Sequence, residues 1–181
     1  MDVSVNMEKM TTQARDDGKG TAWVVMGVSG CGKSSIGSQL ASRLGMPFIE
    51  GDAFHSEANV AKMSAGIALT DDDRHDWLVT LRDKLAAREG GAVLSCSSLK
   101  RAYRDLLRGA GGDVRFVHLA GERGLLLERV SNRPGHYMPP SLLDSQLRTL
   151  EPLQPDEAGI TLDISGTPDQ LVAQILATIH A

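Results

Sequence analysis

Short apolar runs alternate along the chain with segments in which apolar residues recur at every third or fourth position. The runs have the length of buried strands, and they lie at residues 22–26, 46–50, 92–95, 114–119 and 160–164. Strands that alternate with helical segments favour right-handed βαβ units, in which a parallel sheet carries helices on both faces. The pattern therefore predicts an α/β fold built on a five-stranded parallel sheet.

The helical segments between these runs have recognisable starts. We expect helices that begin near residues 33, 70, 99, 124, 141 and 168. Thr70 and Asp73 fit the capping-box pattern, and Asp71 to Asp73 place negative charge in the first turn. The three carboxylates can also be interpreted as a metal site. Helix capping explains them better, because consecutive residues do not readily converge on one ion.

The composition is typical of a globular domain, with 41% hydrophobic and 23% charged residues. We expect one domain over residues 21–181, preceded by a flexible polar extension over residues 1–20. The net charge of -4 offers no general attraction for nucleic acid, and no apolar run approaches the roughly 20 residues that span a membrane. Cys31 and Cys96 provide no disulfide framework, which favours a cytoplasmic location.

A glycine-rich segment links the first predicted strand to the first helix. Its sequence, GVSGCGKS from Gly27 to Ser34, matches the P-loop pattern G-x-x-x-x-G-K-[ST] in full. Glycines let backbone N–H groups approach phosphate oxygens, and the helix N-terminus adds unpaired donors. We therefore expect ATP and Mg²⁺ here, with Lys33 at the β- and γ-phosphates and the Ser34 hydroxyl on the metal ion. The expected nucleotide contacts in the loop are Gly27, Ser29, Gly30, Cys31, Gly32, Lys33, Ser34 and Ser35.

Cys31, inside this loop, has two interpretations. A helix N-terminus favours the thiolate form of a cysteine, which would allow a redox role. The simpler interpretation is that a small side chain fits at this point of the loop.

Other features of the sequence indicate which class of P-loop protein this is. The chain has no N-K-x-D motif for binding guanine, and its small size favours a kinase that acts on a small molecule. Asp52 ends the second predicted strand, where the ligand crevice of a parallel sheet lies. Its carboxylate can accept a proton from a substrate hydroxyl and help to order Mg²⁺ through water, or it can cap a turn. His55 is either a substrate contact or an exposed loop histidine.

Four further segments follow the P-loop in the order GDAFH, LTDDDRHDWL, LKRAYRDLLR and RPGHY. Together with the P-loop they resemble the gluconokinase family, in its P-loop, thermoresistant-type branch, over about residues 24–153. The resemblance implies an adenylate-kinase-like three-layer α/β/α fold with a mobile lid at about residues 131–140. It also implies ATP-dependent phosphorylation of D-gluconate at its 6-hydroxyl, Mg²⁺ dependence and a homodimer. The chain departs from the family at Cys31, Glu50 and Tyr137, where Ser, Asp and Phe are common.

Gluconate carries one carboxylate and several hydroxyls, so its site needs a cation and several hydrogen-bonding groups. The expected substrate contacts are Asp52, His55, Arg74, Lys100, Arg104 and His136. Lys100 and Arg104 are four residues apart on one predicted helix, so both cations can converge on one anion. The alternative for these two and Arg74 is a solvated basic face. His136 either orients the substrate or caps its loop.

Basic residues also precede the expected lid. Arg129 and Arg133 are four residues apart, and on the underside of a lid they would stabilise the transferring phosphoryl group. The alternative is that they complement the end of their helix. Thr167, in the turn after the last strand, is expected to border the adenine, although it is an equally good helix N-cap.

Two other functions stay open at this point. The chain can be another small-molecule kinase on the same scaffold, such as a shikimate or nucleoside-monophosphate kinase. It can also be an ATP-binding regulator without catalytic activity. The presence of Lys33, Ser34, Asp52 and the two arginines favours an enzyme.

Overall fold

The computed structural model describes residues 20–133 and 139–179. Their centre is a five-stranded parallel sheet with the strand order β2-β3-β1-β4-β5. The strands are β1 (Ala22–Met26), β2 (Phe48–Glu50), β3 (Ala92–Ser95), β4 (Val114–Ala120) and β5 (Gly159–Asp163). The predicted α/β class and the parallel five-stranded sheet are therefore confirmed.

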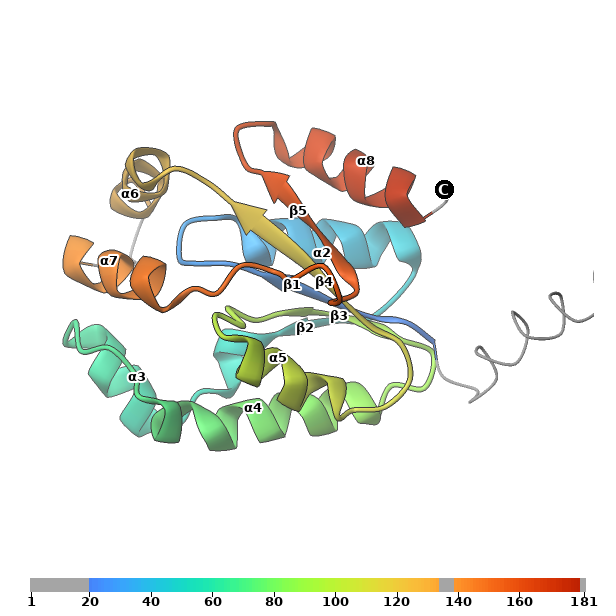
Figure 1. The fold of residues 1–181 in the computed structure, drawn as a ribbon, viewed down its shortest axis with the longest axis horizontal. Helices are drawn as coiled ribbons and strands as arrows, with labels where there is room; N and C mark the ends of the chain where they lie inside the picture. The colour runs from blue at the N-terminus through green and yellow to red at the C-terminus, as the bar shows by residue number, and fades with distance from the viewer. Residues whose placement is uncertain (1–19, 134–138, 180–181) are drawn as a thin grey trace, which may run out of the picture.

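Helices cover both faces of this sheet, which gives the expected three layers (Figure 1). The helices are α2 (Lys33–Leu44), α3 (Glu57–Ser64), α4 (Asp71–Ala86), α5 (Arg101–Arg108), α6 (Arg123–Ser131), α7 (Pro140–Thr149) and α8 (Pro168–Ile179), with a short 3-10 helix, η1 (Gly51–Phe54). Figure 1 shows α2 and α8 on one face and α4 and α5 on the other. The ends of α3, α6 and α7 gather beyond the carboxyl ends of the strands, where ligands bind in such sheets.

The central strands are buried on both sides, as parallel sheets require. All five residues of β1 and all four of β3 are buried, whereas the edge strand β5 alternates between exposed and half-buried residues. β2 begins at Phe48, two residues later than predicted, because Pro47 has no N–H to donate to the sheet. None of the described helices is both long and apolar enough to pass through a membrane.

The start of α4 confirms the capping interpretation of the acidic triplet. The Thr70 hydroxyl accepts a hydrogen bond from the Asp73 amide at 3.1 Å, and the Asp73 carboxylate accepts one from the Thr70 amide at 2.9 Å. A hydrogen bond from Lys62 and the one from Thr70 lower the pKa of Asp73 to about 2. Within residues 20–133 and 139–179, no three His, Cys, Asp or Glu side chains are grouped so as to hold a metal ion.

Two of the predicted segments cannot be compared with the structure. The N-terminal extension lies outside the described residues except for Gly20, and so do residues 134–138 of the expected lid. The division of the chain into an extension and a single domain stays a prediction.

His118 on β4 is a buried histidine that sequence reasoning did not single out. Its side chain is buried among the strands, and its Nδ1 has no hydrogen-bond partner within the described part of the chain. Burial lowers its pKa from the ordinary value of 6.5, and the positive charge of Arg104 lowers it further. The folded protein therefore favours the neutral imidazole.

This shift predicts how stability depends on pH. Below pH 6.5 the unfolded chain binds a proton at His118 that the folded chain does not, so the free energy of unfolding should decrease as the pH falls from 7.5 to 5.5. One proton contributes at most about 1.4 kcal/mol per pH unit. In His118→Leu this dependence should become shallower, as measured by urea unfolding at several pH values. The exposed His75→Gln is the control, and an unchanged slope in His118→Leu would contradict the assignment.

Candidate active site

The P-loop connects β1 to α2 in a conformation that requires glycine at three points. Gly27 has φ 143°, Gly30 has φ 84° and Gly32 has φ 96°, a region that favours glycine. A Cβ atom at Gly27 would lie 2.8 Å from the carbonyl oxygen of Leu119, and one at Gly30 would lie 2.9 Å from that of Leu126. The loop is therefore packed against the end of β4 and against α6, and the N-terminus of α2 points out of it.

Two side chains of the loop can be compared with their predicted roles. The Lys33 Nζ donates a hydrogen bond to the Val28 carbonyl at 3.1 Å, and Lys33 borders a cavity. Cys31 is buried and its Sγ lies 3.9 Å from the Lys33 Nζ. A Cβ at Gly27 would come within 2.7 Å of that sulfur, so space here is tight. This packing supports the interpretation that a small residue is needed at Cys31.

The cavity next to Lys33 has a volume of about 390 Å³. It is bounded by the P-loop, η1, α3, α4, the β3–α5 loop and the facing parts of α6 and α7. Seven of the candidate residues line it: Ser29, Gly30, Lys33, Asp52, His55, Arg74 and Arg133. The fold thus brings the phosphate loop and most of the expected acceptor site to one place.

Asp52 reaches the cavity from η1, directly after β2. Its side chain is 71% exposed, and its Oδ1 lies 3.9 Å from the Nε2 of His55. Gly51 fixes this turn, because its amide donates to Ser95 Oγ and its carbonyl accepts from the Trp77 indole at 2.8 Å. The carboxylate is therefore held at the carboxyl end of the sheet on a well-anchored backbone.

His55 is not the exposed loop histidine that the sequence allowed. Its side chain is only 4% exposed, and its ring stacks on Trp77 with centroids 4.0 Å apart. Burial lowers its pKa, Asp52 opposes this effect, and Arg74 adds to it. A neutral imidazole at this position can exchange hydrogen bonds with a hydroxyl-rich ligand.

Arg74 faces the cavity from α4. Its Nη1 donates a hydrogen bond to the Tyr103 hydroxyl at 3.0 Å, and its guanidinium lies 5.4 Å from the centre of that ring. The Tyr103 hydroxyl in turn donates to Asp71. Burial and the hydrogen bond to Asp71 raise the pKa of Tyr103, so the phenol stays neutral beside the cation. The contact with Tyr103 thus orients the Arg74 guanidinium, and its other N–H donors remain available to the carboxylate of a ligand.

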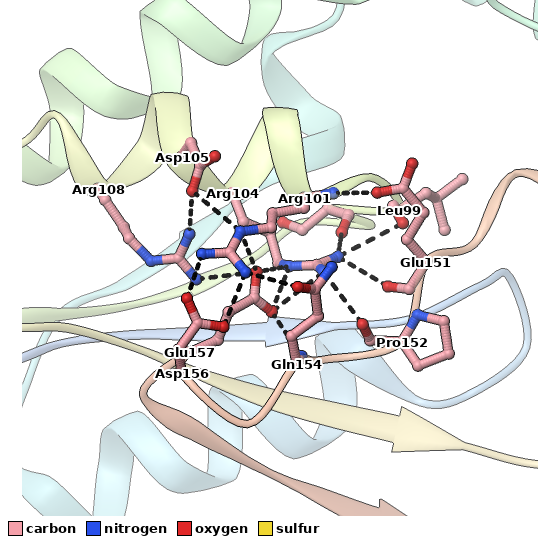
Figure 2. A network of polar contacts seen from close by, with 11 residues as sticks. Leu99, Arg101, Arg104, Asp105, Arg108, Glu151, Pro152, Gln154, Asp156 and Glu157 are labelled. Atoms are coloured by element: carbon pink, nitrogen blue, oxygen red, sulfur yellow. Dashed lines mark hydrogen bonds and ion pairs between the residues drawn. The ribbon is translucent and has the colours of Figure 1, made fainter.

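The expected convergence of Lys100 and Arg104 on one anion is not found. Lys100 Nζ pairs with the Asp71 carboxylate at 3.0 Å and is not among the residues lining the cavity. Arg104 is fully buried and pairs with Glu157 (Figure 2). The remaining Arg104 donors go to backbone carbonyls, so no donor is left for a substrate. The assignment of Arg104 as a substrate contact is wrong.

Arg129 on α6 and Arg133, two residues beyond the end of α6, also separate. Arg133 lines the cavity, whereas the Nη2 of Arg129 donates to the carbonyl of Ile164 at 2.8 Å, beyond the end of β5. Thr167 forms a reciprocal cap with Gln170 at the start of α8, in line with its N-cap interpretation. His136 lies outside the described residues.

Gln146 is a cavity residue that sequence reasoning missed. Its Oε1 accepts a hydrogen bond from the backbone N–H of Ser29 at 2.8 Å, so α7 is tied directly to the P-loop. Trp77 and Ser97 also line the cavity. Nothing in the local sequence marks Gln146, Trp77 or Ser97 as a cavity residue.

Comparison with known proteins identifies the group to which this chain is similar. The shikimate kinase family model matches residues 29–180. The gluconokinase of Gluconobacter oxydans (strain 621H) is 48% identical over 87% of this chain and 90% of its own length. The thermosensitive gluconokinase of Escherichia coli (strain K12) is 42% identical over 87% of this chain and 89% of its own length.

Solved structures agree with this comparison. The crystal structure of a gluconokinase from Sinorhizobium meliloti 1021 superimposes with a TM-score of 0.82 at 48% identity, covering 88% of this chain and 91% of that chain. A shikimate kinase from Acinetobacter baumannii has a TM-score of 0.55 at 19% identity, covering 89% of this chain and 93% of that one, and shares the fold alone. The chain therefore belongs to the gluconokinase family, within the wider group of P-loop kinases that includes shikimate kinase.

Proposed function

We propose that this protein transfers the γ-phosphoryl group of ATP to the 6-hydroxyl of D-gluconate, which yields 6-phospho-D-gluconate and ADP. The observation that carries the proposal is that the P-loop lysine, Lys33, and the carboxylate of Asp52 border the same cavity. Relatives named gluconokinase that match most of the chain support the choice of acceptor. Membership of a kinase family supports the use of ATP.

On the nucleotide side, Lys33 and the P-loop amides hold the terminal phosphates. In-line phosphoryl transfer needs charge stabilisation more than covalent chemistry, because negative charge is spread over the transferring oxygens. Arg133 borders the same cavity and can add a second cation at the γ-phosphate. Arg129, which is bonded to the Ile164 carbonyl, would have to leave that contact to take the same role.

On the acceptor side, Asp52 accepts the proton of the 6-hydroxyl as that oxygen attacks phosphorus. Its exposed carboxylate is free to approach a ligand from the anchored η1 backbone. His55, held by its stacking on Trp77, stands next to the carboxylate and orients the hydroxyl by hydrogen bonding.

The residues present fit a magnesium ion held mainly by phosphates. The Ser34 hydroxyl, in the first turn of α2, and the Asp52 carboxylate, through water, are hard oxygen ligands of the kind Mg²⁺ prefers. Mg²⁺ usually keeps several waters and few protein ligands, which suits the lack of any larger ligand cluster in the described residues. When bound, the ion neutralises charge on the transferring phosphates.

The carboxylate of gluconate is assigned to Arg74, which leads to a prediction. Arg74→Ala should raise the KM for gluconate by about 10–100-fold, because one charge-assisted contact is lost. The KM for ATP should change little, since Arg74 reaches the cavity from α4 rather than from the P-loop. Steady-state kinetics with each substrate varied in turn measure both constants.

The matched control is Arg82→Ala, on the same helix. Arg82 pairs with its neighbour Asp83 and is not among the residues that line the cavity. It should leave both KM values unchanged. Equal increases in both KM values of Arg74→Ala, or no increase for gluconate, would contradict the assignment.

An assay that follows ADP release with different acceptors tests the proposed function as a whole. Gluconate should be phosphorylated, while shikimate and nucleoside monophosphates should not. Faster turnover of either alternative would identify another small-molecule kinase. Tight ATP binding without turnover of any acceptor would indicate a regulator instead.

Two further expectations stay predictions. The homodimer implied by the family resemblance can be tested by light scattering after size exclusion, where a monomer mass close to 19.4 kDa would contradict it. The cytoplasmic location inferred from cysteine usage can be tested by cell fractionation.

A further inference from the structure

We infer that Arg104 and Glu157 form a positioning pair that holds the β3–α5 loop in the shape required by the acceptor side of the cavity. The inference rests on the proposed function, because it assigns a role in gluconate phosphorylation to two residues that do not touch the cavity. It replaces the predicted role of Arg104 as a substrate contact.

The guanidinium of Arg104 is completely enclosed by acceptors of the protein (Figure 2). Both Arg104 and the Glu157 side chain have no exposed surface. The Nε of Arg104 lies 3.1 Å from each Glu157 carboxylate oxygen. Its Nη1 donates to the carbonyls of Ser98 and Glu151 at 3.0 Å, and its Nη2 donates to that of Pro152 at 3.4 Å. The planar group thereby joins three chain segments at once.

One of these segments carries a strained backbone. Ser98 has φ 48° and is the one non-glycine residue with positive φ in the described part of the chain. Its hydroxyl is buried, and within residues 20–133 and 139–179 no hydrogen bond of that hydroxyl accounts for this conformation. Such strain persists only where the surroundings enforce it. The hydrogen bond from Arg104 to the Ser98 carbonyl enforces the positive φ of Ser98 here. The residues on either side of Ser98, Ser97 and Leu99, both line the cavity.

The second segment leads to the opposite wall. Glu151 follows α7, and its amide donates to the Leu99 carbonyl at 2.7 Å while its own carbonyl accepts from Arg104. Helix α7 carries Gln146, which lines the cavity and accepts the hydrogen bond of the P-loop amide of Ser29. Arg104 therefore links the β3–α5 loop, which borders the cavity, to the end of α7, the helix that contacts the P-loop.

Stability alone is a weak reason for such an ion pair. Two charges lose their hydration on burial, and well-packed apolar residues often serve a fold equally well or better. Although burial opposes ionisation of Glu157, hydrogen bonds from Arg104 and from the Gln154 amide keep its pKa below the ordinary value. A charged, planar donor group is suited to fixing several carbonyls in defined directions, which an apolar side chain cannot do.

Arg104→Lys tests the inference, because it keeps the charge beside Glu157 but loses the planar fork to Ser98, Glu151 and Pro152. We expect kcat/KM for gluconate to fall by about 10–100-fold, while the KM for ATP stays within about twofold. Amide hydrogen exchange should become faster in residues 97–100 and 150–153 and unchanged in β1. The control is Asp156→Asn, which weakens an exposed ion pair of Arg101 at the rim of the same cluster and should change neither readout.

Unchanged gluconate kinetics in a folded Arg104→Lys protein would overturn the inference. Equal losses for gluconate and ATP would also overturn it, because they would indicate a general loss of structure. Should Arg104→Lys fail to fold, Glu157→Gln is judged by the same two criteria. If the unmodified protein does not phosphorylate gluconate, the proposed function fails, and the exchange pattern still decides whether Arg104 holds the loop.

Discussion

Lys33→Ala is expected to lower kcat by about 10³-fold or more without unfolding the protein. Removing one preorganised donor from the developing charge of a transition state costs about 10²–10³-fold, and removing a full cation from a phosphoryl-transfer site costs up to about 10⁵-fold. Lys33 is partly exposed at the start of α2, and among the described residues it bonds within the P-loop alone, so its truncation should spare the core. Turnover measured by ADP release, with circular dichroism as a check of folding, provides the test.

The control for this prediction is Lys84→Ala. Lys84 lies on α4, where its Nζ is 4.4 Å from the centre of the Phe54 ring, and it does not line the cavity. Its replacement should leave kcat close to normal. Near-normal turnover in Lys33→Ala would refute the assigned role of the P-loop lysine.

Asp52→Asn is expected to lower kcat by about 10²–10⁴-fold, the usual contribution of a general base. The amide cannot accept the proton of the attacking hydroxyl, although it keeps the size of the carboxylate and one of its two acceptor oxygens. The KM for ATP should change little, because Asp52 is anchored through Gly51 and Trp77 on the acceptor side of the cavity. Steady-state kinetics at saturating gluconate separate the two effects.

Asp72→Asn is a matched control, since it makes the same chemical change at an exposed carboxylate in the first turn of α4. It should retain normal kcat. A loss of ATP affinity in Asp52→Asn with normal kcat would mean that Asp52 acts on the metal ion alone and is not the base.

The parts of the fold that depend on local pattern were predictable. β1 and β3 occur where the apolar runs placed them, because central strands of a parallel sheet must be apolar on both faces. The capping box at Thr70 and the P-loop at Gly27–Ser34 were also recognised, since each depends on residue types at short, fixed spacing.

The roles of the basic residues were harder to predict because they depend on partners far along the chain. The spacing of Lys100 and Arg104 predicts one helical segment for both, but α5 begins at Arg101 and Lys100 is its extended N-cap residue. The spacing also does not reveal their acceptors. The partner of Arg104, Glu157, is 53 residues away, beyond α7. Gln146 accepts a hydrogen bond from the backbone amide of Ser29, which lies 117 residues earlier in the chain. Such contacts arise from the packing of whole elements, which local sequence does not encode.

A crystal structure of the protein with a non-hydrolysable ATP analogue, Mg²⁺ and gluconate would show whether the P-loop and Asp52 hold the two substrates in one cavity. We expect the γ-phosphate on the amides between Gly30 and Ser34, with Lys33 in contact. We also expect the 6-hydroxyl oxygen of gluconate within about 2.6–3.2 Å of the Asp52 carboxylate. A nucleotide bound elsewhere, or an Asp52 carboxylate remote from both the γ-phosphate and the hydroxyl, would contradict this arrangement.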